Sequence, residues 1–364
     1  MRILYDGQIY ADQTTGGINR YFANIINRLP REISPTLITP HQRDKLHYPV
    51  HPNLSLREYW GFRPRRISNR VRAHYFRWLC NNSCFDIHHP TYYVRLTQDS
   101  FSQTCLPLVI TVYDMIHELF SNTIENGDYV VRAKQEAIAA ADAILCISHS
   151  TKADLLRYFP NIEAKITVTH LASELSIDCA YGNEVVPLLP YFLYVGSRTK
   201  IYKNFDTLLI AFSKVADTNS DIQLCVVGAP FNTEEQQFII ELKLTERIKH
   251  YQWPSDAHLA KLYRCAQAFI YPSLYEGFGI PLLEAMACGT VVVAADSSSI
   301  PEVVGDAGIL FEPKAVNDLV DILLHLLTSS SEREQLINQG YKRSQTFNWN
   351  ITAEQTTQVY KSLL

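Results

Sequence analysis

Residues 191–205 read YFLYVGSRTKIYKNF, and this stretch decides the fold. Five apolar or aromatic residues of strand length lead through a glycine-bearing loop into a helix expected from Phe205 to about residue 216. Strand, loop and helix in that order form one half of a βαβ unit in a parallel sheet. Arg198 and Lys203 flank the amino end of the helix, where free amides and the helix dipole favour an anion. The segment therefore predicts an α/β fold with a diphosphate site, against the alternative of an exposed loop with incidental basic residues.

The same order of elements recurs along the rest of the chain. Apolar runs of strand length alternate with segments of helical period, which predicts further βαβ units and parallel sheets. In the N-terminal half we expect strands at 2–5, 108–112 and 143–147 and helices at 17–29, 127–141 and 150–159, with Ser148 and Ser150 near a helix N-cap. In the C-terminal half we expect strands at 222–227, 268–271 and 291–294 and helices at 233–244, 256–266 (N-cap Ser255), from Pro281 onward, 316–328, 331–346 and 350–363.

The length of 364 residues predicts two domains. Residues 173–190 carry no clear period and contain Gly182, Pro187 and Pro190, so we place the boundary there. The predicted organisation is an N-terminal Rossmann-like domain at 1–175, a linker at 176–190, a second Rossmann-like domain at 191–346 and a final helix at 347–364. Sheets of this kind bind ligands beyond the carboxyl ends of their strands, and we expect a site in a cleft between the two halves.

Composition indicates a folded protein, because 47% of the residues are hydrophobic and only 19% are charged. The eight cysteines are scattered, and several stand in apolar runs, which favours reduced thiols. No apolar run approaches the length of a membrane span or a signal peptide, so we expect a cytoplasmic location.

One charged segment departs from the even mixture elsewhere. Seven arginines stand between Arg57 and Arg77, opposed only by Glu58. If residues 65–79 are helical, one face gathers the apolar side chains of Ile67, Val71, Tyr75 and Trp78. Such a face either packs on the N-terminal sheet, which we favour, or docks on anionic lipid as a peripheral contact at the inner face of the membrane.

A second motif, residues 275–284, reads YEGFGIPLLE and follows the strand expected at 268–271. Glu276 stands in a glycine-bearing loop and Glu284 in the first turns of the next helix, so both carboxylates can face one site. A carboxylate accepts hydrogen bonds from two neighbouring hydroxyls, as in ribose or a hexose. Gly277 and Gly279, on either side of Phe278, allow backbone amides to approach a ligand closely.

Together the Glu276-x7-Glu284 element, the upstream Arg198 and Lys203, and the Gly16-Gly17 pair resemble the retaining glycosyltransferases of family 4, over essentially the whole chain. The resemblance implies the GT-B fold: two Rossmann-like, doubly wound parallel-sheet domains facing a cleft, with a C-terminal helix crossing back to the first domain. It implies that residues 1–175 form the acceptor-side domain and that residues 191–346 bind the donor nucleotide. It implies that Glu284 holds the nucleotide ribose, that Glu276 contacts the donor sugar, and that Arg198 and Lys203 bind the diphosphate. Gly277, Phe278 and Gly279 complete the donor loop, and the Gly16-Gly17 turn stands beside the donor phosphates.

The resemblance also implies a polar residue near the reacting sugar in the strand-end segment 111–117. Tyr113 stands where many relatives have histidine, so Asp114 and His117 are both candidates, beside Glu276, for the catalytic group. A purely local role, with Asp114 capping a turn, is the alternative. His89 ends another expected strand and is a candidate for the acceptor side.

No two aspartates are separated by a single residue, so the DxD motif that holds a metal in other glycosyltransferases is absent. We therefore expect no metal and no cofactor, with a nucleoside diphosphate sugar as co-substrate and a hexose (mannose or glucose-type) moving to a glycan, glycolipid or small-molecule hydroxyl. A non-catalytic protein that binds sugar nucleotides is the alternative. A Rossmann oxidoreductase is disfavoured because no GxGxxG follows an expected strand, and no feature indicates nucleic acid as a partner.

Overall fold

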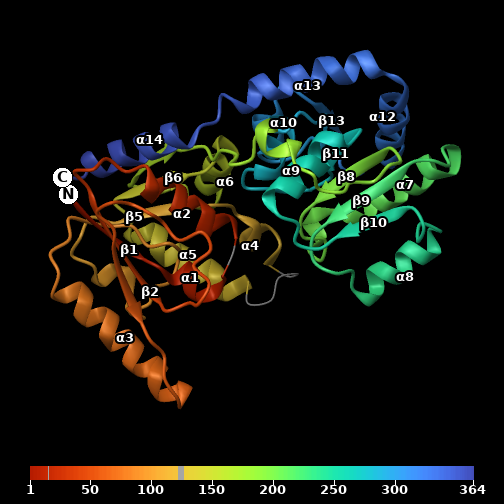
Figure 1. Ribbon diagram of the computed structural model, residues 1–364. Coiled ribbons are helices and arrows are strands. Elements are labelled where there is room, and N and C mark those ends of the chain that lie inside the picture. The colour runs from red at the N-terminus through yellow and green to blue at the C-terminus, as the bar shows by residue number, and fades with distance from the viewer. Residues whose placement is uncertain (15, 122–126) are drawn as a thin grey trace. The chain divides into compact units, whose positions relative to one another are not determined.

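The computed structural model describes residues 1–14, 16–121 and 127–364, which divide into two compact units (Figure 1). Unit 1 comprises Met1–Leu171 and Trp349–Leu364, and unit 2 comprises Ala172–Asn348. Each unit is built on parallel strands with helices between them, so the predicted α/β class is confirmed. Among the described residues, no helix combines the length and the apolar character needed to cross a membrane.

Unit 1 contains seven described strands, all paired in parallel. Four lie in the order β3-β2-β1-β4 and three in the order β5-β6-β7, and a parallel bridge between His88 and Leu108 joins the two groups. The strands are β1 (Arg2–Asp6), β2 (Ser34–Pro40), β3 (Ser55–Tyr59), β4 (Ile87–His88), β5 (Val109–Val112), β6 (Ala143–Cys146) and β7 (Lys165–Val168).

The final helix α14 belongs to unit 1, as the predicted fold requires. Its Tyr360 hydroxyl lies 3.1 Å from that of Tyr5 in the first strand, and the Trp349 ring packs edge-on against Tyr21 of α2. The helices of unit 1 are α1 (Gln8–Asp12), α2 (Gly17–Asn27), α3 (Arg65–Asn81), α4 (Ile116–Leu119), α5 (Gly127–Ala140), α6 (His149–Tyr158) and α14 (Trp349–Lys361), with a 3₁₀ turn η1 (Phe101–Gln103). Ser148 caps α6, as predicted, by accepting from the amide of Thr151 at 2.9 Å.

Unit 2 is a doubly wound sheet of six described strands in the order β10-β9-β8-β11-β12-β13. The order reverses between β8 and β11, and that reversal is where such sheets bind ligands. The strands are β8 (Tyr191–Val195), β9 (Gln223–Val227), β10 (Ile248–Tyr251), β11 (Ala268–Tyr271), β12 (Val292–Ala295) and β13 (Ile309–Phe311). The helices are α7 (Phe205–Thr218), α8 (Thr233–Glu241), α9 (Asp256–Cys265), α10 (Ile280–Ala287), α11 (Ile300–Val304), α12 (Val316–Thr328) and α13 (Ser330–Ser344), with 3₁₀ turns η3 (Ile177–Tyr181) and η4 (Ile201–Lys203).

The segment expected as a linker is packed on unit 2. Its η3 turn lies against α9, where the Arg264 guanidinium stands 3.8 Å from the centre of the Tyr181 ring. Lys261 donates to the carbonyl of Gly182 at 2.7 Å. Ser255 caps α9, as predicted, by accepting from the amide of His258.

Helix α3 turns an unexpected face inward. The buried side chains are Ser68, Ala73 and Phe76, and Phe76 packs with Leu4, Ile38 and Leu96 in one core cluster. Ile67, Val71 and Trp78, which were expected to pack on the sheet, are exposed, so that prediction is wrong for three of the four stripe residues. Only Tyr75 is partly buried, and it packs beside the same cluster.

Asn204 fixes the entry of the chain into α7. Its backbone is left-handed, with φ of 54°, a conformation that asparagine tolerates better than most residues. Its side-chain amide donates to the carbonyls of Pro272 (3.0 Å) and Pro313 (2.9 Å), and its oxygen accepts from the Thr207 hydroxyl at 2.8 Å. One side chain therefore joins three segments of unit 2.

Replacing Asn204 with alanine removes all three side-chain bonds and places a less tolerant residue in the left-handed conformation. We expect Asn204→Ala to lower the free energy of unfolding by about 2–4 kcal/mol, measured by urea denaturation. Asn219→Ala, at the other end of α7, is the control and should cost less than about 1 kcal/mol. Equal effects of the two substitutions would contradict this account of Asn204.

Candidate functional site

The loops that follow β8 and β11 meet where the strand order of unit 2 reverses. Lys203, at the end of the first loop, places its ammonium 2.7 Å from Oε1 of Glu276 in the second loop. The amide of Leu274 also donates to the carbonyl of Tyr202 at 2.7 Å, so backbone and side chains both join the two loops. The Lys203 and Glu276 side chains retain 17% and 10% exposure, which leaves this pair within reach of a ligand. The sequence thus predicted two residues that the fold brings into contact.

Three serines after β12 hold the backbone around Glu276. Ser298 accepts from the amide of Glu276 at 2.8 Å, and Ser299 donates to the carbonyls of Glu276 (2.8 Å) and Phe278 (3.0 Å). Ser297 donates to the carbonyl of Leu274. Burial, and secondly the neighbouring Glu276 carboxylate, raise the pKa of Tyr271 well above its ordinary value, so this phenol stays neutral. The backbone of the Glu276 loop is therefore held in place by these serines, which no sequence pattern singled out.

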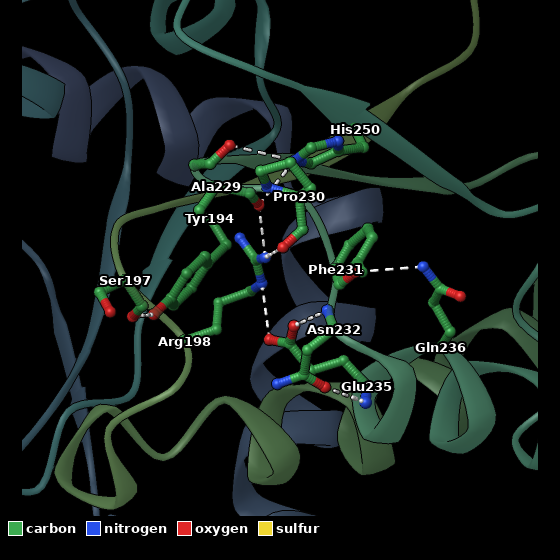
Figure 2. Close-up of polar contacts among 11 residues, drawn as sticks. Tyr194, Ser197, Arg198, Ala229, Pro230, Phe231, Asn232, Glu235, Gln236 and His250 are labelled. Atoms are coloured by element: carbon green, nitrogen blue, oxygen red, sulfur yellow. Dashed lines mark hydrogen bonds and ion pairs between the residues drawn. The ribbon is translucent and has the colours of Figure 1, made fainter.

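Arg198 has other partners than Lys203 and belongs to the network that Figure 2 shows. Its Nε donates to Oε1 of Glu235 at 2.9 Å, and Nη2 donates to the carbonyls of Ala229 (2.5 Å) and Pro230 (3.2 Å). The guanidinium lies 4.5 Å from the centre of the Phe231 ring, and the side chain is 1% exposed. Arg198 is therefore a buried, paired cation, which contradicts the alternative of a solvated loop residue.

The remaining nitrogen of Arg198, Nη1, is buried, and no hydrogen bond to it is found among the described residues. It points toward Gly228, whose backbone has φ of 153°. A Cβ at that glycine would stand 2.9 Å from Nη1 and 2.6 Å from the carbonyl oxygen of Gly196. Nη1 is the guanidinium nitrogen without a partner among the described residues, and it is buried, whereas the resemblance implied that the guanidinium binds the diphosphate.

Glu235 is a site residue that the sequence analysis missed. Its second oxygen, Oε2, accepts from the amide of Asn232 at 2.8 Å, and the Asn232 side chain accepts from the amide of Glu235 in return. This capping box starts α8 and aims the other oxygen at Arg198. Asparagine followed three residues later by glutamate is a pattern that indicates a helix start. The contact between this glutamate and Arg198 could not be predicted from that pattern.

Glu284 and the glycine loop complete the predicted donor residues. Glu284 lies buried on α10, and its Oε2 accepts from the Tyr263 hydroxyl at 3.2 Å. Gly279 precedes α10 with φ of 105°, a left-handed conformation that favours glycine, and Gly277 is buried in the same loop. The Phe278 side chain is buried against Phe347, so only the Phe278 backbone can meet a donor.

Gly16 and Gly17 lie at the amino end of α2 in unit 1. Gly16 is extended and occupies the N-cap position, and a Cβ at Gly17 would meet nothing within 4 Å. The helix start is therefore open to a ligand on the Gly17 side. Free amides at a helix start are suited to a phosphate, which is the role that the resemblance implies for this turn.

Asp114 takes the local role that the sequence left as an alternative. Its Oδ1 accepts from the amide of Ile116 at 3.0 Å. Its carbonyl accepts from Lys134, whose ammonium also lies 2.8 Å from Glu118 in a fully buried pair. His117 is half-buried in the first turn of α4, beside this pair in the chain. The turn that carries both candidate catalytic residues is thus anchored by Lys134, which the sequence analysis missed.

His89 does not line an acceptor site, and that expectation is wrong. The ring is fully buried, with Nδ1 2.6 Å from the Tyr360 hydroxyl and Nε2 2.8 Å from the Thr111 hydroxyl. Burial lowers the pKa of His89 to about 3, so the ring is neutral in the folded protein. His89 links α14 to the sheet of unit 1 because β4 is an interior strand covered by that helix.

Two family models match, and together they cover most of the chain. "Glycosyltransferase Family 4" matches residues 15–172, and "Glycosyl transferases group 1" matches residues 187–343. The O-antigen chain mannosyltransferase B of Escherichia coli is 32% identical over 250 residues, covering 65% of this chain and 64% of that protein. The MMP alpha-(1->4)-mannosyltransferase of Mycolicibacterium hassiacum is 35% identical over 226 residues, covering 61% of this chain and 54% of that protein. The match thus spans less than two thirds of the length of both relatives.

Solved structures agree in fold. Sucrose-phosphate synthase from Thermosynechococcus elongatus aligns with a TM-score of 0.78 at 20% identity, covering 100% of this chain and 99% of that one. Anabaena Alr3699/HepE in complex with UDP and glucose aligns with a TM-score of 0.73 at 16% identity, each chain being 99% covered. Fold and family models together define a glycosyltransferase of the GT-B fold. Within that class, the chain belongs to the glycosyltransferases of the family 4 type.

The buried His89 predicts a pH dependence of stability. Because the folded pKa of about 3 lies below the ordinary value of 6.5, the unfolded chain binds a proton at mildly acidic pH and the folded chain does not. This contribution to stability is present above pH 6.5 and is lost as the pH falls toward 3.

Between pH 7 and pH 5 we expect His89 to account for a fall of about 2 kcal/mol in the free energy of unfolding, measured by urea denaturation. His89→Gln should have a lower free energy of unfolding than the wild type at pH 7. Between pH 7 and pH 5 its free energy of unfolding should fall by about 2 kcal/mol less than that of the wild type. His74→Gln, on the exposed side of α3, is the control and should keep the wild-type slope. An unchanged slope in His89→Gln would refute the assignment.

Proposed function

We propose that the chain transfers a hexose from a nucleoside diphosphate sugar to a hydroxyl of a glycan or lipid-linked acceptor in the cytoplasm, with retention of the anomeric configuration and without a metal. Family membership supports glycosyl transfer. The relatives from Escherichia coli and Mycolicibacterium hassiacum are both mannosyltransferases, which favours mannose as the first sugar to test. The glucose in the Anabaena complex keeps glucose-type sugars in the same test.

The contact between Lys203 and Glu276 carries this proposal. It stands at the reversal of strand order, where a doubly wound sheet binds nucleotides. Lys203 supplies a cation for the diphosphate, and Glu276 supplies a carboxylate for sugar hydroxyls. Each of the two neutralises the charge of the other, so neither charge is left unpaired in a partly buried place.

The proposed reaction takes place on one face of the sugar. The bond from the anomeric carbon to the leaving phosphate oxygen breaks, and the acceptor oxygen forms a bond to the same carbon. The leaving phosphate takes the proton of the acceptor hydroxyl. Lys203, Nη1 of Arg198 and backbone amides stabilise the negative charge that grows on the diphosphate. Glu284 holds the ribose.

The proposal is tested by measuring sugar transfer from UDP-, GDP- and ADP-sugars in the presence of EDTA. We expect one donor class to support transfer, and EDTA to leave the rate unchanged because fixed cations do the work of a metal. Loss of transfer in EDTA, restored by Mg²⁺ or Mn²⁺, would contradict metal independence. Donor binding without transfer to any hydroxyl acceptor would indicate the alternative, a protein that only binds sugar nucleotides.

Substitutions at the candidate site should separate turnover from donor binding. Lys203→Ala should lower kcat about 100–1,000-fold, because the lysine meets charge that grows only in the transition state. Glu284→Gln should mainly raise KM for the donor, since the ribose does not change during the reaction. The measurement is steady-state kinetics with purified, folded variants.

Lys200→Ala is the matched control, because Lys200 is an exposed lysine of the same loop. It should keep kcat and KM within about threefold, as expected for a surface substitution away from the site. If Lys203→Ala turns over at the wild-type rate with saturating donor, the assignment of Lys203 to the diphosphate is wrong. This conclusion does not depend on which of the UDP-, GDP- and ADP-sugars is the donor.

A further inference from the structure

Unit 1 presents a basic and aromatic surface along α3 and the loop before it, hereafter the α3 surface. It joins bulky apolar side chains to arginines, and all of its members are exposed. The apolar members are Trp60, Phe62, Ile67, Val71 and Trp78, and the basic members are Arg63, Arg65, Arg66 and Arg70. In Figure 1, α3 (orange) lies at the outside of unit 1.

The apolar side chains of this surface are not part of the core. Trp60 is 67% exposed, Ile67 53% and Trp78 59%. The inner side of the helix is already filled by Phe76 and its neighbours in the core cluster. Single exposed apolar residues are common, but a contiguous group of them marks a contact surface.

Helical geometry gathers these residues into one stripe. Positions 67, 71 and 78 fall on one face of an α-helix, opposite Phe76, and Arg66 and Arg70 lie along one flank of that face. The preceding loop is tied to the first turns of the helix, because the amide of Phe62 donates to the Ser68 hydroxyl at 3.1 Å. The backbone of Phe62 therefore lies next to the first turns of α3, and the exposed Trp60 just before it stacks one ring face on His41.

The charge of the surface has one sign. No acidic residue occurs between Glu58 and Asp86 in the sequence. Arg77 is the arginine of α3 that a distant carboxylate neutralises, with its Nη2 2.6 Å from Asp99. The exposed arginines around residues 63–70 form no ion pair with any described residue. The surface is complementary to an anionic partner.

We propose that the α3 surface docks on an anionic lipid bilayer, with the apolar stripe in the interfacial layer and the arginines at the headgroup phosphates. Tryptophan favours the boundary between headgroups and hydrocarbon, and the aliphatic Ile67 and Val71 gain from hydrocarbon contact. Nucleic acid would use the arginines and aromatic rings but would leave the aliphatic side chains without a partner. A lipid surface is the partner that satisfies every member of the surface.

Binding to vesicles tests the proposal directly. The full chain should float with vesicles of phosphatidylcholine plus phosphatidylglycerol at low salt, and should not float with phosphatidylcholine alone. Arg66→Glu/Arg70→Glu should reduce the partition coefficient by roughly fivefold or more for each arginine. Ile67→Ser/Val71→Ser should also reduce it, which a purely electrostatic contact would not show.

Matched controls lie on other exposed helices of unit 1. Arg132→Glu/Arg157→Glu changes the net charge by the same amount, but on α5 and α6. The partition coefficient of this variant should stay within about twofold of the wild-type value. Brominated lipids should quench the fluorescence of the wild-type chain, and Trp60→Phe/Trp78→Phe should abolish that quenching although the exposed Trp253 of unit 2 remains.

Each of three results would overturn the proposal: no flotation with anionic vesicles at low salt, equal loss of binding in the α5 and α6 control, or quenching that persists without Trp60 and Trp78. Binding to heparin or RNA in the absence of vesicle binding would assign the surface to a soluble polyanion instead. Circular dichroism spectra of all variants should match the wild type, since every substituted residue is exposed.

Discussion

Two ion pairs hold the loop after β8 from opposite sides, and the candidate site depends on them. Arg198 closes the loop onto the segment after β9 through Glu235, and Lys203 closes it onto the loop after β11 through Glu276. The two pairs differ in burial: Arg198 is 1% exposed, whereas Lys203 retains 17%. A buried pair resists separation because each ion would lose its only compensation. The more exposed pair can exchange partners when a phosphate arrives, so the first pair is suited to shaping the loop and the second to meeting the ligand.

Much of this arrangement could be predicted from the sequence, because strands and helices follow local patterns. The strand of Tyr191–Val195 and the helix start at Phe205 were legible from apolar runs and a glycine loop. The different partners of Arg198 and Lys203 could not be predicted from the sequence. They depend on the short 3₁₀ turn η4, which ends at Lys203, and on the left-handed Asn204, neither of which has a periodic signal.

His89 and α3 show the other limit, which is set by long-range contacts. His89 ends a strand, as many ligand-binding residues do, but its partner Tyr360 lies 271 positions away on the final helix. Nothing local to His89 predicts that cover. In α3 the sequence indicated one apolar face, but the fold buries the side that holds Phe76, which packs with Leu4, Ile38 and Leu96. Amphipathic spacing predicts that a helix has an apolar face, but it does not predict which part of the fold that face contacts.

The same reasoning explains why positive charge is distributed as it is in this chain. Inside the units, cations are paired: Lys134 with Glu118, Arg198 with Glu235, and Lys203 with Glu276. Burial makes an unpaired charge costly, so each buried cation brings its own carboxylate. The arginines of the α3 surface stand in water and need no such partner to be stable. Their accumulation beside exposed tryptophans therefore has no explanation in the folding of unit 1, and contact with an external anionic surface supplies one.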